Sequence, residues 1–240
     1  MSLLQSFNDG KKKLAVLIDP DNYDEFSLKN LLEKAVANKV SYLLVGGSLL
    51  YKNQFHTTVE FLKENSTIPV IIFPGNSFQV SEKADGILFL SLVSGRNPAY
   101  LIGEQVIAAP AVQQANIEVI PTAYILIEGG KISATSYITQ TIPIPAQKSE
   151  IAATTALAAS FLGMKVVYLE AGSGAETPVN SKVITAVKKT VNLPLIVGGG
   201  ITNVNAVSLA FNAGADMVVI GNVLEANPKI LDEIGLFFNS

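Results

Sequence analysis

Leu195-Ile-Val-Gly-Gly-Gly-Ile-Thr-Asn203 and Met217-Val-Val-Ile-Gly-Asn222 are the two stretches that decide the fold. Each begins with a short apolar, β-branched run, which is typical of a parallel strand buried on both faces. Each run passes directly into glycines, which let the main chain approach a phosphate closely because they lack a Cβ. After the first stretch, Asn203 is placed to begin a helix. The pair therefore predicts two consecutive strand–loop–helix units with an anion site in their loops.

Eight runs of this kind occur along the chain, separated by helical patterns. We predict strands at Leu14–Asp19, Ser41–Val45, Val70–Phe73, Gly86–Leu90, Val119–Ile127, Val166–Glu170, Leu195–Val197 and Met217–Ile220. Strands that alternate with helices imply a parallel sheet, and eight such units close naturally into a barrel. The predicted fold is therefore α/β, a (β/α)₈ TIM barrel. One domain over residues 1–240 suffices, because such barrels run to about 250 residues.

Start and stop signals place the helices, and two segments depart from the regular pattern. We predict helices that begin at a Ser27 cap, after Ser149 with an end at Gly163, at Thr177-Pro178, and at an Asn203 cap with an end at Gly214. Between Phe73 and Gly86 only a short helix around Ser77–Ala84 fits, so the third helix is reduced. Residues 129–147 predict a hairpin or a lid over the fifth strand.

The composition excludes several classes of protein. Hydrophobic residues make up 49% and charged residues 15%, against roughly 25% charged in an ordinary domain. The net charge of −3 argues against a nucleic-acid partner, because phosphate backbones select basic faces. With no cysteine and a single histidine, disulfides, thiolate chemistry and multi-histidine metal sites are excluded. No signal peptide or membrane span is visible, so we expect a cytoplasmic protein.

The sixth strand carries the strongest candidate catalytic group. Tyr168 and Glu170 alternate onto one face of that strand, and Gly172-Ser-Gly174 forms the loop that follows. A glutamate at the carboxyl end of a barrel strand lies where catalytic groups lie, and here it could take the proton from a substrate hydroxyl. The alternative is a salt-bridged residue at the rim. The glycine loops likewise have an alternative, in which they only form tight turns.

Asp19 and Ser48 end the first two strands and form a second candidate site. A carboxylate and a hydroxyl on adjacent strand ends could share a Mg²⁺, which needs few protein ligands when a phosphate supplies the others. Equally, Asp19 could cap a turn and Ser48 a helix. Tyr124 points either into the barrel or into the core. His56 falls on the helix after the second strand, where we expect it to be solvated or packed.

Together these motifs resemble the geranylgeranylglyceryl phosphate synthase family, with its heptaprenylglyceryl phosphate synthase relatives. The matching pieces are Ile18-Asp-Pro-Asp21, Gly46-Gly-Ser48, Tyr168-Leu-Glu-Ala-Gly-Ser-Gly174, Gly198-Gly-Gly-Ile201 and Gly221-Asn222. The resemblance implies a barrel with a reduced third helix. It also implies a Mg²⁺-dependent prenyltransferase that joins sn-glycerol 1-phosphate to a long polyprenyl diphosphate, of the geranylgeranyl type, as an ether and releases diphosphate. Such a reaction belongs to the biosynthesis of ether phospholipids.

The resemblance also implies the site residues. By matching position, Mg²⁺ is held by Asp19 and Ser48, and glycerol phosphate by Tyr168, Leu169, Glu170, Ala171, Gly172, Ser173, Gly174, Gly199, Gly200, Gly221 and Asn222. Glu170 is the expected catalytic base. Some members place a phosphate-binding lysine two residues before the metal aspartate, where this chain has Leu17. A homo-oligomer is expected too, and so is a peripheral contact with membranes through the lipid substrate.

Two other functions fit the glycine loops. The first is another phosphate-binding TIM-barrel lyase or isomerase, although these usually rely on a lysine or paired acids at strand ends. The second is a non-catalytic binder of a phosphorylated metabolite, which needs neither Glu170 nor a metal. Diphosphate release, measured with and without Mg²⁺, separates both from a prenyltransferase.

Overall fold

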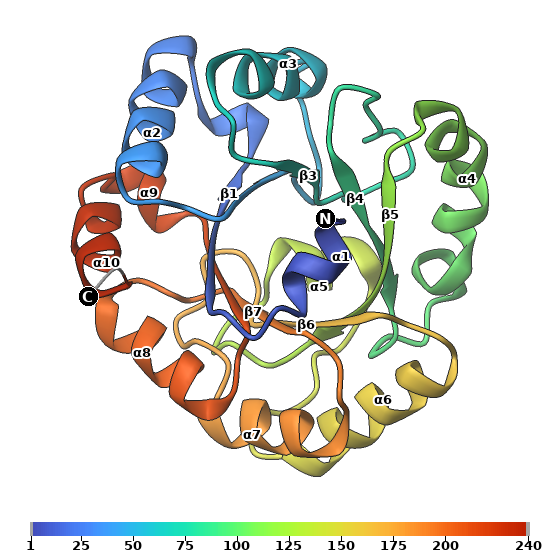
Figure 1. The fold of residues 1–240 in the computed structure, drawn as a ribbon. Coiled ribbons are helices and arrows are strands. Elements are labelled where there is room, and N and C mark those ends of the chain that lie inside the picture. The colour runs from blue at the N-terminus through green and yellow to red at the C-terminus, as the bar shows by residue number, and fades with distance from the viewer. Residues whose placement is uncertain (1, 239–240) are drawn as a thin grey trace.

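The eight predicted strands form one closed, all-parallel barrel in a computed structural model that describes residues 2–238 (Figure 1). Each strand pairs with its neighbour in sequence, and the last pairs with the first. The strands are β1 (Lys13–Ile18), β2 (Tyr42–Val45), β3 (Val70–Ile72), β4 (Gly86–Leu92), β5 (Glu118–Leu126), β6 (Val166–Glu170), β7 (Leu195–Gly198) and β8 (Met217–Ile220). The predicted fold class is confirmed.

Helices surround the barrel, as Figure 1 shows in a view along its axis. They are α1 (Leu3–Phe7), α2 (Glu25–Ala37), α3 (Phe55–Asn65), α4 (Glu104–Ala115), α5 (Ala134–Thr139), α6 (Ser149–Phe161), α7 (Ser181–Thr190), α8 (Val204–Ala213), α9 (Val223–Ala226) and α10 (Ile230–Phe238). A 3₁₀ turn covers Pro20–Asn22, and a π-helical turn, Ala99–Gly103, leads into α4. None of the helices in residues 2–238 is both long and apolar enough to cross a bilayer.

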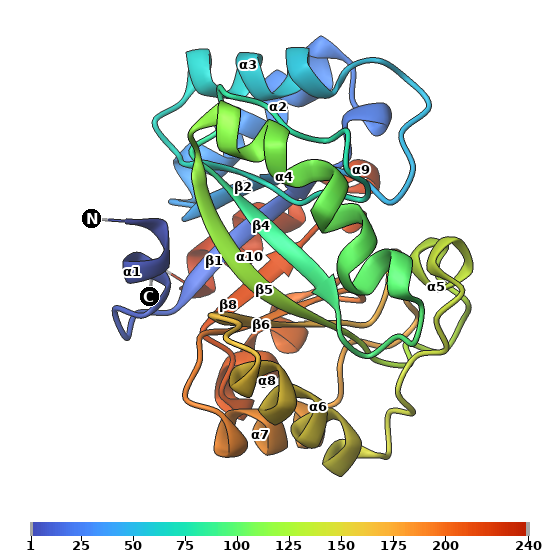
Figure 2. The same cartoon turned by 90° about the vertical axis from the view of Figure 1, so that its right-hand side faces the viewer.

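Alternation along the strands divides the core into two layers. Leu44 packs inside the barrel, whereas Leu43 and Val45 on either side of it pack outward against the helices. The interior layer includes Tyr42, Leu44, Ile71, Leu88, Tyr124, Tyr168, Ile196 and Val219. Most strand residues are therefore buried on both faces, which explains why the strands read as continuous apolar runs. Helix α1 closes the end of the barrel where the strands begin (Figure 2), and its Leu3 and Leu4 N–H groups donate to the Glu118 carboxylate.

The third helix is absent rather than reduced, so the predicted helix at Ser77–Ala84 is wrong. Residues 73–85 form bends and turns between β3 and β4. Some of their N–H groups close short turns, as that of Val80 does on Phe78 O at 3.0 Å, and others bond to side chains. Ser77 N–H donates to Glu104 at 2.8 Å and Gly75 N–H to Gln79 at 3.2 Å. Side-chain acceptors of this kind compete with helix formation. The outer face of β3 and β4 therefore lacks its covering helix.

Two predicted helix starts are also wrong, because in each helix another residue is the N-cap. Asp24, not Ser27, caps α2, and Ser27 is the reciprocal partner in the resulting capping box. Asn180, not Thr177-Pro178, caps α7 through a side-chain bond to Lys182 N–H. The starts at Ser149 and Asn203 and the helix end at Gly214 are confirmed. Asparagine and aspartate accept from the first-turn N–H groups of a helix, which is why they prevail here.

Residues 129–147, which we call the lid, form a helical cover and not a hairpin. Helix α5 lies within this segment, beyond the carboxyl ends of the strands (Figure 2). A parallel bridge between Ile127 and Ile144 closes the segment on itself. The lid is joined to the loop after β2 by a 3.1 Å hydrogen bond between the Ser48 and Thr135 hydroxyls. The lid therefore stands over the mouth of the barrel.

Candidate active site

A cavity at the mouth of the barrel, which we call the mouth cavity, gathers most of the predicted site residues. It is lined by the ends of β1, β2, β6, β7 and β8 and by the lid, and the predicted residues in this lining are Asp19, Ser48, Tyr168, Glu170, Ser173, Gly174, Gly199, Gly200, Gly221 and Asn222. Leu169 and Ala171 are not part of the lining, because their side chains pack in the outer layer against the helices. Gly172 is buried behind the loop. His56 is exposed on α3, away from the mouth cavity.

Glu170 is a buried carboxylate without a cationic partner. Its side chain is 5% exposed, and Oε1 accepts the Gly172 N–H at 2.7 Å. Burial raises the pKa of Glu170 to about 7, although the Gly172 N–H and the neighbouring Tyr168 hydroxyl both favour the charged form. A carboxyl group with such a pKa exchanges a proton near neutral pH, which suits a general base. The alternative of a salt-bridged rim residue is excluded, since no described cation pairs with it.

Gly198 at the end of β7 and Gly199 directly after it leave space for the side chain of Glu170. A Cβ on Gly199 would overlap Glu170 Oε1 and would stand 2.8 Å from the N–H nitrogens of Ala171 and Gly172. A Cβ on Gly198 would overlap the Tyr168 hydroxyl and stand 3.0 Å from Glu170 Oε2. Gly199 also has a φ of +82°, a region that favours glycine. These glycines therefore do more than make a tight turn.

Three aromatic rings form the floor of the mouth cavity. Tyr168 stacks on Phe73 with ring centroids 5.2 Å apart, and its centroid lies 5.4 Å from that of Tyr124. Tyr124 thus points into the barrel, which resolves the two orientations that its sequence allowed. Burial, followed by the Glu170 charge, raises the pKa of both tyrosines well above the usual value, so both remain protonated. The Tyr168 hydroxyl makes no hydrogen bond of ordinary geometry with described residues, so it has a donor to offer a substrate.

The loops after β6, β7 and β8 meet on one side of the mouth cavity. Ser173 Oγ donates to Asn222 Oδ1 at 2.9 Å, which ties the first of these loops to the last. Gly174, Gly199 and Gly200 all have positive φ and present main chain instead of side chains. Leu17 lies beside Gly221, where a Cβ would be 3.5 Å from that of Leu17. Among the described residues, the lining contains no lysine or arginine.

Asp19 and Ser48 line the mouth cavity at the ends of β1 and β2. Asp19 Oδ1 accepts the Asp21 N–H at 3.0 Å, while Oδ2 lies against Gly47 in the loop that carries Ser48. Burial raises the pKa of Asp19 above its ordinary value, and the Asp21 charge adds to that rise. A half-buried carboxylate with a free oxygen fits a divalent cation. Residues 2–238 offer no cluster of three or more acidic or histidine ligands, so such a cation would take its other ligands from phosphate and water, as Mg²⁺ does.

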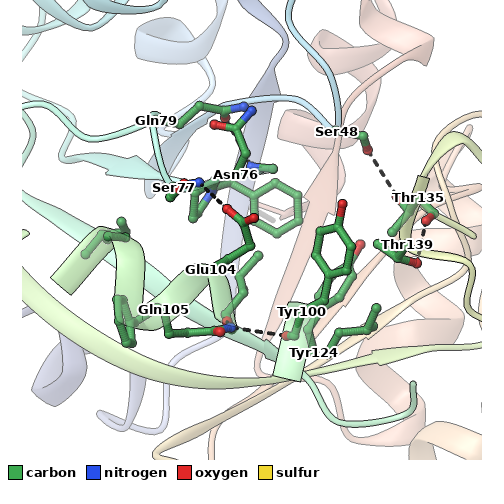
Figure 3. A pocket seen from close by; sticks show the side chains of 18 of the residues that line it. Ser48, Asn76, Ser77, Gln79, Tyr100, Glu104, Gln105, Tyr124, Thr135 and Thr139 are labelled. Carbon is green, nitrogen blue, oxygen red and sulfur yellow. Dashed lines mark hydrogen bonds between the residues drawn. The ribbon is translucent and has the colours of Figure 1, made fainter. Parts of the chain in front are cut away.

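A second cavity, which we call the side groove, extends from the mouth cavity between β4 and helix α4. The two cavities share Gly47, Ser48, Phe73, Tyr124, Thr135 and Ile138. Most of the side groove is apolar, with Val80, Ile87, Phe89, Leu90, Leu92 and Ala108 in its lining. An apolar lining with a few polar groups is typical of small-molecule pockets. Figure 3 shows Glu104 directed at Ser77 on one side and Ser48 at Thr135 on the other.

Several residues of this region escaped sequence reasoning. Gln79 is 3% exposed, and its amide donates to Gly47 O at 2.9 Å while accepting from the N–H groups of Gly47 and Gly75. Thr135 and Ile138 reach both cavities from the lid, and Glu225 reaches the mouth cavity from α9. No signal in the sequence marks Gln79, because it stands among other polar residues such as Asn76, Ser77 and Ser81. The sequence predicts a hairpin or lid at residues 129–147, but no pattern in it places Thr135 and Ile138 at the cavities.

Comparison with known proteins identifies the family of this chain. The model of the PcrB family matches residues 9–236. Geranylgeranylglyceryl phosphate synthases from Spirosoma linguale and Korarchaeum cryptofilum are 43% and 40% identical to this chain over 98% of its length, and the matches cover 94% and 96% of those proteins. The protein of the same name from Chitinophaga pinensis is 46% identical over 94% of this chain and 89% of its own.

Solved structures agree. The (S)-3-O-geranylgeranylglyceryl phosphate synthase from Thermoplasma acidophilum, crystallised with sn-glycerol-1-phosphate, has a TM-score of 0.93 and 32% identity, with 100% of this chain and 98% of the other covered. An N-acetylmannosamine-6-phosphate 2-epimerase from Clostridium perfringens shares the fold alone, with a TM-score of 0.60 and 12% identity over 98% of this chain and 96% of its own. Matched over nearly its whole length, this chain belongs to the PcrB family and is an enzyme of the geranylgeranylglyceryl phosphate synthase type.

Proposed function

We propose that the protein joins sn-glycerol 1-phosphate to a long polyprenyl diphosphate through an ether bond and releases diphosphate in a Mg²⁺-dependent reaction. The observation that carries this proposal is the junction of a polar, glycine-lined cavity with an apolar groove. One substrate is small and anionic, and the other combines an anionic head with an apolar tail. Few reactions other than transfer of such a tail need both surfaces side by side.

The glycerol phosphate is expected on the side of the mouth cavity formed by the loops after β6, β7 and β8. The relative from Thermoplasma acidophilum was crystallised with this compound. Gly174, Gly199, Gly200 and Gly221 can turn main-chain N–H groups towards a phosphate without obstruction. With the phosphate held there, a three-carbon substrate brings its free hydroxyl near Glu170 and Tyr168. These positions support the predicted roles of both residues in binding.

Glu170 would remove the proton of the attacking hydroxyl. An alcohol is a poor nucleophile until that proton leaves, and a positioned base typically contributes about 10²–10⁴-fold. The carboxylate keeps Oε1 on the Gly172 N–H, so Oε2 is the oxygen free to accept a proton. The Tyr168 hydroxyl, which lies beside Oε2, can hold the substrate oxygen in place by donating to it.

Asp19 and Ser48 would hold Mg²⁺ at the ends of β1 and β2, where Ser48 lines both the mouth cavity and the side groove. When bound, the ion neutralises the charge that develops on a departing diphosphate. The apolar lining of the side groove would take the prenyl tail, whose burial releases about 25 cal/mol per Å² of apolar surface. In this arrangement Glu170 would serve the glycerol phosphate and Asp19 the prenyl diphosphate.

The other two functions are less well supported. A sugar-phosphate lyase or isomerase has no use for the side groove, and the described lining offers it no lysine. A non-catalytic binder would not need a buried carboxylate with a pKa of about 7. The deciding experiment measures diphosphate release with each substrate alone, with both, and with and without Mg²⁺. Release that does not require glycerol phosphate would contradict the proposal.

A homo-oligomer forms part of this proposal. Helix α4 and the turn before it expose Ile102, Val106 and Ile107 at 60%, 64% and 62%. Contiguous apolar residues on a surface are typical of a contact between proteins. The cytoplasmic location and the peripheral contact with membranes stay predictions.

A further inference from the structure

The mouth cavity lacks the positive charge that a phosphate dianion calls for. Three carboxylates, Asp19, Glu170 and Glu225, belong to its lining, whereas no described lysine or arginine does. Leu17 takes the place on β1 from which a cation could have reached inward. Main-chain N–H groups bind an anion through charge-assisted bonds, but they carry no net positive charge to balance it. A cation from outside the lining would therefore add much to phosphate binding.

Lys131, at the start of the lid, is in position to supply it. Its ammonium lies 3.5 Å from the point where a Cβ on Gly174 would stand, and Cε lies 3.9 Å from the same point. Gly174 and Ser173 belong to the lining of the mouth cavity, in the loop expected to hold the phosphate. The side chain is exposed and flexible, so a small rotation directs the ammonium at an anion on that loop.

The backbone that carries Lys131 is fixed against the β6 loop. Gly129 O accepts the N–H groups of Glu176 at 2.9 Å and Thr177 at 3.2 Å. A Cβ on Gly129 would overlap Ala171 O, so the two segments touch main chain to main chain. Further along, Ser133 packs on Gly172, where a Cβ would be 2.9 Å from the Ser133 hydroxyl. The lysine is therefore held beside the loop even though its own side chain is free.

The ammonium of Lys131 has no partner of its own. It makes no ion pair or hydrogen bond with residues 2–238, and the nearby Glu176 is beyond ion-pair distance. Three other basic groups at this end of the barrel, Lys52, Arg96 and Lys148, are engaged. Lys52 donates to Asp21 O at 2.6 Å, Arg96 to Gly95 O at 2.8 Å, and Lys148 lies 3.8 Å from the Glu150 carboxylate.

We propose that Lys131 provides the positive charge for the phosphate of sn-glycerol 1-phosphate, from the lid and not from the barrel wall. The inference rests on the proposed function, in that it takes the phosphate to lie on the β6 loop. It assigns a substrate-binding role to a residue that the family motifs do not include. It also answers how a site with Leu17 on β1 can bind a dianion.

The test compares Lys131→Met with Lys131→Arg and measures the Kd of sn-glycerol 1-phosphate by calorimetry without a prenyl donor. Loss of one charge-assisted bond should raise the Kd roughly tenfold in Lys131→Met, and arginine should restore most of the affinity. The Kd of the wild type should rise with salt, and that of Lys131→Met should rise less steeply, because one screened charge pair is gone. At saturating glycerol phosphate, kcat should change little.

Lys148→Met is the matched control, because it removes the same charge just beyond the other end of the lid. It should leave the Kd unchanged. Lys131→Met with the Kd and salt dependence of the wild type would overturn the inference, as would a variant whose only defect is a higher KM for the prenyl diphosphate. The binding measurement is independent of turnover. A wild type that binds glycerol phosphate but transfers no prenyl group would therefore count against the proposed function and leave the role of Lys131 intact.

Discussion

The Glu170 carboxylate occupies the space that a Cβ on Gly199 would need. Oε1 would overlap that Cβ, and the same Oε1 accepts the Gly172 N–H at 2.7 Å. Oε1 of Glu170 is therefore the point of contact between the strand that carries the candidate base and the loop that is expected to bind phosphate. A substitution on either side should displace the other, so this contact is the first to test.

Gly199→Ala should destabilise the protein and abolish most of its activity. The new Cβ displaces Glu170, and the φ of +82° adds strain of about 1–3 kcal/mol. We expect a lower Tm and a fall in diphosphate release of roughly 10² or more, since the base is moved. Gly163→Ala is the matched control: its φ is +90° but nothing lies within 4 Å of the Cβ, so it should lose stability without losing activity. Equal activity losses in the two variants would refute the steric argument.

Glu170→Gln should lower kcat by about 10² or more while glycerol phosphate affinity changes little. Glutamine preserves the shape and the bond to Gly172 N–H but cannot take a proton. Because burial raises the pKa of Glu170 to about 7, kcat/KM of the wild type should rise with pH through that region, and the variant should lose this rise. The exposed Glu82→Gln serves as control. A variant that keeps near-normal turnover would reduce Glu170 to a binding residue.

The same substitution should change the pH dependence of stability. The pKa of Glu170 is raised from 4.5 in a free carboxyl to about 7 in the fold, so the folded state binds the proton more tightly. The stability that this proton contributes is complete below pH 4.5 and is lost as pH rises through 7. The Tm of Glu170→Gln relative to wild type should therefore be higher at pH 8 than at pH 5. Thermal unfolding at the two pH values checks this, and an identical difference at both would contradict it.

Asp19→Asn should raise the Mg²⁺ concentration needed for half-maximal activity, by roughly tenfold, with little effect on glycerol phosphate binding. Asparagine can still accept the Asp21 N–H, so the turn should persist while the charge is lost. Activity is measured across a Mg²⁺ titration. Asp24→Asn makes the same chemical change at the exposed cap of α2 and should leave the titration as it is. An unchanged titration for Asp19→Asn would show that Asp19 is a turn residue only.

Gln79→Leu should weaken the prenyl diphosphate side of the site. Its amide holds Gly47 by both N–H and carbonyl, so its loss leaves buried polar groups unpaired, at about 1–3 kcal/mol. The loop that carries Ser48 should loosen, with a higher KM for the prenyl diphosphate and an unchanged Kd for glycerol phosphate. Gln79→Glu keeps the acceptor but loses the donor. Its KM for the prenyl diphosphate should therefore lie between those of the wild type and Gln79→Leu. An equal effect on both substrates would point to general loss of folding instead.

The strands and the glycine loops could be predicted from local sequence. Runs such as Leu195–Val197 and Met217–Ile220 are apolar on both faces, and only a buried parallel strand uses such a run. The Glu170 position followed from strand alternation, and Gly199 and Gly221 followed from the need for bare backbone at a strand end. Asn203 could be predicted as an N-cap because a capping side chain bonds within the first turn of its own helix.

The remaining features were decided by contacts between segments far apart in sequence. The turn at Ser77 is held by Glu104, from a later unit, which accepts the Ser77 N–H. Thr135 and Lys131 reach the site because main chain packs against main chain at Gly129 and Gly172, which no periodic pattern records. The raised pKa of Glu170 comes from burial, which exists only once the barrel closes around it. Local preferences thus determined which segments became strands. Desolvation and long-range hydrogen bonds decided what their ends could do.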